Sequence, residues 1–121
     1  MNRLELEERL IDFSVLSIEI AGKLNTSNPG RHLSNQLIRS GTSVSLNYAE
    51  AQSGESRKDF LHKMKIVLKE LRETSVCLKI IKRARLHQSD KRLQEAATEC
   101  DELISIFVKS ITTAQKNMLR L

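Results

Sequence analysis

Apolar residues recur at steps of three and four along most of this chain, with little to interrupt them. The four stripes cover residues 6–24, 33–51, 60–78 and 93–118. This is the spacing of one face of an α-helix. The 121 residues include one proline and four glycines, too few for the many turns of a β fold. The sequence therefore predicts an all-α protein of four long helices.

Short polar segments separate the stripes. By composition, residues 25–30 and 52–55 are expected to be loops. Ser56 and Ser89 each stand where they can cap the helix that follows. Because short loops place consecutive helices side by side in opposite directions, we expect residues 1–121 to form a single domain, an antiparallel up-down-up-down four-helix bundle. Its core must be aliphatic, since aromatic residues make up only 3% of the chain.

No motif for catalysis or cofactor binding is apparent. Cys77 and Cys100 lie far apart without a CxxC pair, so neither a zinc site nor a disulfide framework is expected, and a reduced, cytoplasmic setting fits. The three histidines lack metal-ligand spacing, and neither a glycine-rich phosphate loop nor a nucleophile motif is present. No leader and no apolar run of membrane-spanning length is found. We therefore expect no enzyme, no metal, no cofactor and no membrane partner.

Two neighbouring acids, Glu70 and Glu73, are the best candidates for acid–base chemistry. They stand among Lys65, Lys69 and Arg72. We therefore interpret them as ion-pairing groups or as polar contacts inside the bundle.

The positive charge of the chain is concentrated in one segment. Residues 56–92 hold twelve basic and four acidic residues, a formal charge of +8 in a chain whose net charge is +5. At 100° per residue, six of these side chains and one histidine share one side of the third helix, opposite its apolar stripe. They are Lys58, His62, Lys65, Lys69, Arg72, Lys79 and Arg83. This row is either a solvated surface or a binding surface for a phosphate backbone or an acidic protein. No aromatic residue is interleaved for base stacking, which favours duplex or structured RNA over unpaired strands.

Two helices carry a second apolar face, although a four-helix bundle buries only one stripe per helix. On the first helix this face comprises Leu4, Ile11, Val15 and Ile18, and on the third it comprises Ile66, Cys77, Ile80 and Ala84. Scattered surface aliphatics are normal, but contiguous ones indicate a subunit interface. The interface predicted from these faces consists of Leu4, Ile11, Val15, Ile18, Ile66 and Ile80.

The second helix contains Ser40-Gly41-Thr42-Ser43 at its centre. These residues form helices poorly, so packing must offset them. Small side chains allow a neighbouring helix to approach closely, and hydroxyls can bond to carbonyls one turn earlier. The alternative is a polar floor at an interface or ligand groove.

Residues 39–78 resemble the signature of a known family. The matching positions are Arg39-Ser40-Gly41-Thr42-Ser43, Asn47, Glu50-Ala51, Ser53, Asp59-Phe60, His62-Lys63, Lys69-Glu70, Glu73-Thr74 and Leu78. They are similar to those of the bacterial four-helix-bundle proteins named for the 23S rRNA intervening sequence, also described as S23-type. The resemblance implies a ring-like homopentamer. It also implies a fold similar to the accessory variability determinant of diversity-generating retroelements, a basic pentamer that binds nucleic acid and a reverse transcriptase.

The chain departs from this pattern in two places. Val76-Cys77 stands where close relatives often have an aromatic pair, and Ser45-Leu46 replaces Gly-Ala. The polar residues that the resemblance marks as family determinants are Arg39, Asn47, Glu50, Lys69, Glu70 and Glu73. They serve packing, assembly or binding.

Two functions are consistent with these features. The first is a non-enzymatic homo-oligomer that binds structured RNA or DNA electrostatically through Lys58, Lys65, Lys69, Arg72, Lys79 and Arg83. The second is an adaptor that docks a partner protein, with nucleic-acid binding incidental.

Overall fold

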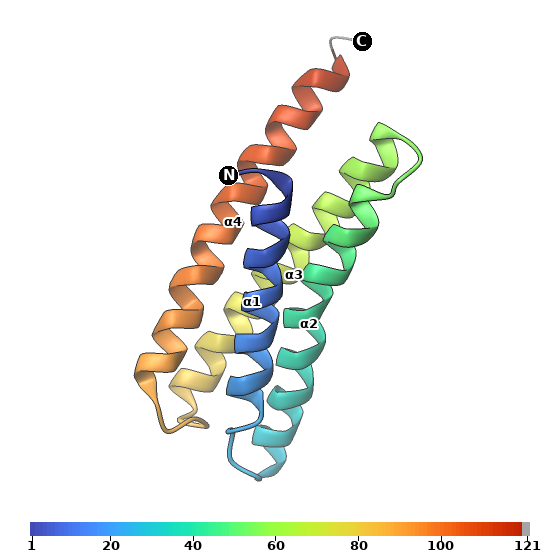
Figure 1. Cartoon of the computed structure of the whole chain (residues 1–121). Helices are drawn as coiled ribbons and strands as arrows, with labels where there is room; N and C mark the ends of the chain where they lie inside the picture. Colours follow the sequence, from blue (N-terminus) through green and yellow to red (C-terminus); the bar gives the residue numbers. More distant parts are fainter. Residues whose placement is uncertain (120–121) are drawn as a thin grey trace.

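The computed structural model describes residues 1–119, which form four α-helices joined by short loops (Figure 1). Helix α1 spans Arg3–Ala21, α2 Asn28–Gln52, α3 Arg57–Arg83 and α4 Asp90–Leu119. The α1–α2 and α3–α4 loops lie at one end of the bundle, and the α2–α3 loop lies toward the other (Figure 1). No strand occurs in this part of the chain, so the all-α prediction of four helices is confirmed. None of the helices described has the length and apolar character needed to cross a bilayer.

Serine side chains start the last two helices, as the sequence predicts. The Ser56 hydroxyl accepts a hydrogen bond from the amide of Asp59 at 3.1 Å, and the Ser89 hydroxyl accepts one from the amide of Arg92 at 3.2 Å. Each bond satisfies an amide that has no carbonyl partner in the first turn, which is worth about 1 kcal/mol at such positions.

The start of α2 differs from the prediction. Residues 25–30 were expected to be a loop, but α2 already begins at Asn28, with Ser27 as its cap. Pro29 and Gly30 therefore lie in the first turn, and the Gly30 amide donates to the Ser27 hydroxyl at 3.2 Å. Proline is tolerated there because a first-turn amide has no helical acceptor.

Two clusters of mainly aliphatic side chains form the core, one nearer each end of the bundle, and the first also contains aromatic rings. The first includes Leu10, Phe13, Val44, Val67, Leu71, Leu103 and Phe107. The second, nearer the α1–α2 and α3–α4 loops, includes Ile20, Leu37, Leu78, Ile81 and Leu93. Tyr48 meets Phe107 edge to face, with ring centroids 5.8 Å apart. Burial of each large side chain contributes roughly 1.5–3 kcal/mol.

A buried polar layer separates the two clusters, and Ser40 and Gly41 of the Ser40–Ser43 segment belong to it. The Ser40 hydroxyl accepts from Thr74 of α3 at 2.8 Å, and Ser14 of α1 donates to the Gly41 carbonyl at 2.7 Å. Ser17 lies against Gly41, where an added Cβ would stand 2.5 Å from the Ser17 side chain. The small residues of α2 thus allow α1 to approach closely, as predicted. The two α1 serines were not anticipated.

The remaining hydroxyls of this segment bond within α2. Thr42 donates to the Ile38 carbonyl at 2.6 Å and Ser43 to the Arg39 carbonyl at 2.7 Å. This is the bonding to the preceding turn that the sequence suggested. No buried side-chain nitrogen or oxygen among the described residues lacks a hydrogen-bond partner.

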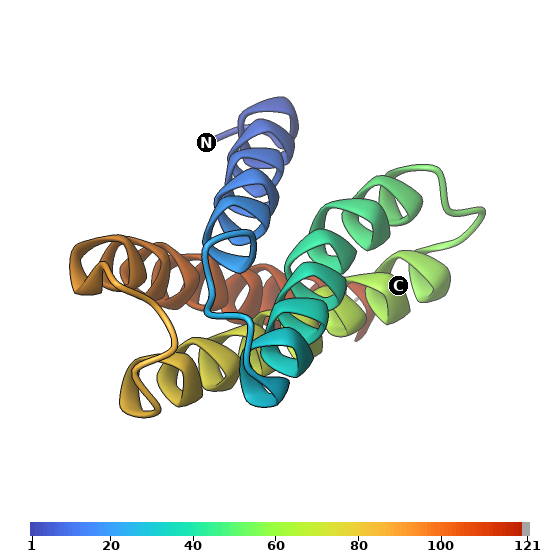
Figure 2. The same ribbon diagram turned by 90° about the horizontal axis from the view of Figure 1, so that it is seen from below.

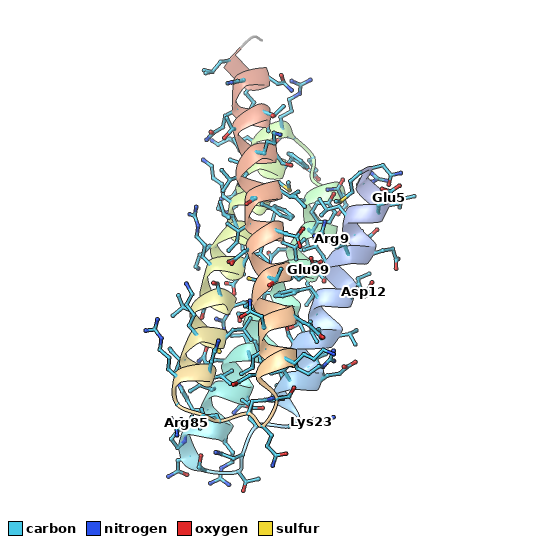
Figure 3. All side chains as sticks on the ribbon, turned by 90° about the vertical axis from the view of Figure 1, so that its left-hand side faces the viewer. Glu5, Arg9, Asp12, Lys23, Arg85 and Glu99 are labelled. Atoms are coloured by element: carbon cyan, nitrogen blue, oxygen red, sulfur yellow. The ribbon has the colours of Figure 1, made fainter. Side chains whose placement is uncertain are left out.

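Helix α1 packs chiefly against α2, and its contact with α4 is the least extensive between adjoining helices. Figure 2 shows the N-terminal end of α1 diverging from the other three helices. Arg9 reaches across this wider gap to Glu99 of α4 (Figure 3), with its Nη2 2.7 Å from Oε1. Polar contacts therefore supplement sparse packing between α1 and α4.

Because α1 and α2 approach closely at Gly41, we predict that adding one methyl group there lowers the stability of the fold. Gly41→Ala should lower the free energy of unfolding by about 1–2 kcal/mol, because overpacking outweighs the better helix propensity of alanine. Gly22→Ala is the matched control, since its Cβ would lie 3.5 Å from the nearest atom. Urea denaturation measures both. Equal stability of the two variants would contradict the packing argument.

The buried cysteines predict a dependence on pH. Burial raises the pKa of Cys77 to about 11 and that of Cys100 to about 12, from an ordinary value of 9.0. Both thiols should therefore react slowly with Ellman's reagent at about pH 8 in the folded protein and rapidly in denaturant, because the thiolate is the reactive form. Since the folded pKa values are raised, these groups stabilise the fold below about pH 9, and this contribution is lost as the pH rises toward 11–12. Rapid labelling of the native protein would contradict this.

Candidate nucleic-acid interface

The basic residues predicted to share one side of α3 are all exposed. They are Lys58, His62, Lys65, Lys69, Arg72, Lys79 and Arg83, and we call them the α3 basic face. The opposite side of the helix buries Met64, Val67, Leu71 and Leu78 in the core. The 3.6-residue period of α3 therefore places its basic face in solvent.

The two acids on α3 turn away from this face and toward α2. Arg39 of α2 binds both: its Nη1 lies 3.1 Å from Oε2 of Glu70, and its Nη2 contacts Oε1 of Glu73. Glu70 is only 6% exposed. The hydrogen bond to Glu73 and the charges of both carboxylates raise the pKa of Arg39, against a smaller opposing effect of burial. The interpretation of these acids as ion-pairing groups is confirmed, with a partner on the neighbouring helix.

The ion pairs of the described residues use other cations. Arg9 and Arg92 pair with acids between α1 and α4, and Lys63 pairs with Glu50 at 2.5 Å. Within residues 1–119, no carboxylate lies within 4.0 Å of a charged group of the α3 basic face. The described part of the subunit therefore provides no direct ion pair to this face.

Exposed aliphatic residues interrupt the α3 basic face between Arg72 and Lys79. Val76 is 54% exposed and Ile80 46% exposed. The protein's aromatic residues lie elsewhere: Phe13, Tyr48 and Phe107 are buried, and Phe60 packs partly buried against the core. No Phe, Tyr or Trp ring is available to stack on bases along this face, whose other members besides His62 are lysines and arginines.

The family-motif residues mostly join α2 to α3. Besides the Arg39 contacts, Glu50 binds Lys63, and Asn47 donates to the Ser43 carbonyl at 2.9 Å within α2. Of the motif residues, His62 and Lys69 lie on the α3 basic face. The motif therefore describes packing and ion pairing more than a solvent-facing site.

The residues of the predicted oligomer interface are exposed on α1, whereas on α3 one of the two is exposed and the other is half-buried. Exposed fractions on α1 are 62% for Leu4, 40% for Ile11, 46% for Val15 and 47% for Ile18. On α3, Ile80 is exposed and Ile66 half-buried.

Cys77 corrects the second apolar face proposed for the third helix. It is 6% exposed, and its thiol faces the Leu33 carbonyl of α2 at 3.8 Å. The buried arc of α3 is wider than the Met64–Leu78 stripe, because α3 packs against both α2 and α4. A periodicity argument that assumes a single contact line misplaces residues at the edge of this arc.

Other cations lie at the end of the bundle that carries the α1–α2 and α3–α4 loops, and the periodicity of the sequence did not group them. Lys23 and Arg85 lie at this end of the bundle (Figure 3). Helical periodicity could not find them because both stand in loops; the charge of residues 56–92 included Arg85 without placing it. Among residues 1–119, no group of three His, Cys, Asp or Glu side chains could hold a metal ion.

Comparison with known proteins finds a similar solved structure and a matching family model. A crystal structure at 1.70 Å resolution of a protein of unknown function, from the S23 ribosomal protein family of Bacteroides thetaiotaomicron, is similar with a TM-score of 0.83. It shares 26% identity, over 93% of this chain and 99% of the other. No curated protein matches. The family model described as 23S rRNA-intervening sequence protein matches residues 2–109. The chain therefore belongs to the 23S rRNA-intervening sequence protein family, as the motif residues of α2 and α3 suggested.

Proposed function

We propose that this protein is a non-enzymatic homo-oligomer that binds structured RNA or DNA through the α3 basic face. The observation that carries the proposal is the row of exposed cations without carboxylate partners along α3. The ion pairs of the described residues use Arg9, Arg39, Lys63 and Arg92, and the unpaired cations of α3 differ from others on the surface by standing in one row. A polyanion supplies the charge that the α3 basic face lacks.

The shape of the face suits a phosphate backbone. From Lys58 to Arg83 the helix rises roughly 35 Å, at about 1.5 Å per residue. Lysine and arginine contacts to phosphates give affinity without base specificity and release counterions, so binding weakens steeply with salt. Because no phenylalanine, tyrosine or tryptophan ring is exposed along the face, we favour paired, structured nucleic acid over stacking on single strands.

Assembly would multiply this surface. The exposed aliphatics of α1 and those of α3 are different patches, so contact between them is heterologous and closes into a ring when the rotation permits. The family resemblance implies a pentamer. Several copies of the α3 basic face in one ring would convert weak single contacts into useful affinity.

A second candidate function is an adaptor that docks a partner protein. The observation in its favour is the exposure of Val76 and Ile80 among the cations, a mixed surface that suits an acidic amphipathic helix. The partner would then be recovered with the protein after nuclease treatment, whereas a partner bridged by RNA would be lost.

The binding proposal predicts a charge-specific loss of affinity. Lys65→Gln, Lys69→Gln and Arg72→Gln together should weaken binding of a fluorescein-labelled RNA stem-loop and make the log-log salt slope shallower by about three, roughly 0.9 per phosphate contact. Anisotropy titrations at several salt concentrations measure both.

A control variant separates local from overall charge. Arg3→Gln, Lys109→Gln and Lys116→Gln change three exposed residues outside α3 and remove the same charge from the +5 chain. This variant should retain most of the affinity. Equal weakening by both sets would show that only net charge matters, and no binding by the native protein at low salt would refute the proposal.

The assembly proposal predicts that one charge on α1 disperses the oligomer. Light scattering at micromolar concentration should give a multiple of the 13.8 kDa chain mass, five in the case of a pentamer. Val15→Glu should reduce it toward the monomer, because a charge in an apolar interface is poorly solvated. Val108→Glu on α4, a position 40% exposed against 46% for Val15, is the control and should leave the mass unchanged. A native monomer would contradict this part of the proposal.

A further inference from the structure

The end of the bundle where two loops meet carries a second group of cations. Its members are Lys23 of the α1–α2 loop, Arg31 near the start of α2, Lys82 and Arg83 at the end of α3, and Arg85 of the α3–α4 loop, all exposed. We call these the basic loop end. The Asn25 amide donates to the Leu86 carbonyl at 3.0 Å. This bond joins the two loops, so Lys23 and Arg85 are held at one end of the molecule (Figure 3).

The acids nearest to this end in the chain are mostly engaged elsewhere. Glu19 and Glu95 both bind Arg92, at 2.5 and 3.0 Å. Asp90 lies in the first turn of α4, where a carboxylate complements the helix dipole. No carboxylate of the described residues lies within 4.0 Å of the charged groups of the basic loop end. Like the α3 basic face, it receives no direct ion pair from the described part of the subunit.

The backbone conformation of Arg85 suits glycine better than arginine, so the turn alone does not explain why an arginine stands at this position. Arg85 has φ of 56°, the one non-glycine residue with positive φ among those described. It closes α3: the amide of Leu86 donates to the Ile81 carbonyl at 3.1 Å, while Leu86 and Ile81 are both buried. Glycine is the usual residue at this position of a helix end, because it alone adopts a left-handed conformation without steric cost. A strained residue with an exposed charge is a reason to look for a function of that charge.

We propose that the basic loop end is a second phosphate-binding surface that continues the α3 basic face around the end of the bundle. Lys79, Lys82 and Arg83 in the last turns of α3 connect the two surfaces. The ligand is the sugar-phosphate backbone of the same RNA or DNA, and Arg85 donates its guanidinium hydrogens to phosphate oxygens. This inference rests on the proposed function and extends its site beyond one helix.

A single substitution separates binding from folding at Arg85. Arg85→Gly removes the charge and relieves the positive φ, so it should raise the melting temperature while weakening binding of the fluorescein-labelled RNA stem-loop about threefold to tenfold. Arg85→Lys keeps the charge and should bind nearly as well as the native protein. Lys109→Gln, which removes one charge from exposed α4, should leave the affinity unchanged.

A triple variant enlarges the effect and tests the two surfaces against each other. Lys23→Gln, Lys82→Gln and Arg85→Gly match the net charge of the α3 variant Lys65→Gln, Lys69→Gln and Arg72→Gln. We expect each triple variant to make the salt slope shallower by about three. If only the α3 variant weakens binding, the loop-end inference is wrong and the proposed function stands. If only the loop-end variant weakens binding, the basic loop end is the binding surface and the assignment to the α3 basic face is wrong. If the native protein does not bind, both fail.

Discussion

The buried polar layer across α1, α2 and α3 is the constraint on which the bundle depends. Ser14 and Ser17 of α1, Ser40 and Gly41 of α2, and Thr74 of α3 lie between two aliphatic clusters. Aliphatic clusters alone tolerate sliding of one helix along another, because apolar contacts are not directional. Hydroxyls inside the core oppose such sliding, since each hydroxyl left without a hydrogen-bond partner costs roughly 1–3 kcal/mol. Only one register joins Thr74 to Ser40 and seats Ser17 against Gly41, so the layer fixes how the helices align.

The same α2–α3 contact that stabilises the fold also shapes its charged surface. Arg39 draws Glu70 and Glu73 toward α2, and Glu50 holds Lys63 on that side. Glu73 stands one turn after Lys69 on α3, so without its bond to Arg39 it would be free to offset the charge of that lysine. Ion pairing between helices thus segregates acids from cations. The positive face is a consequence of how the bundle is held together as well as of composition.

Sequence periodicity predicted much of this fold, and its failures have physical causes. Four helices, the Ser56 and Ser89 caps and the close contact at Gly41 follow from local rules that require no knowledge of neighbours. Pro29 was misplaced because the same residue suits a loop and a first helical turn. Cys77 was misplaced because α3 contacts two helices rather than one. The α1 serines gave no signal at all, since a serine on an apolar face becomes meaningful only when its partner carbonyl is known.

The candidate site was predictable to the extent that it lies on one helix. Lysines and arginines at helical spacing must share a side of α3, whereas Lys23 and Arg85 are held at the same end of the bundle by a loop-to-loop hydrogen bond that no spacing rule contains. The family motif gives little further help, because Arg39, Glu50, Glu70 and Glu73 serve the α2–α3 contact and a fold does not determine a function. On the α3 basic face, the residues other than His62 and Lys69 stand outside the motif. Members of this family can therefore share the bundle, with its polar contacts intact, and still differ in what their outer surfaces bind.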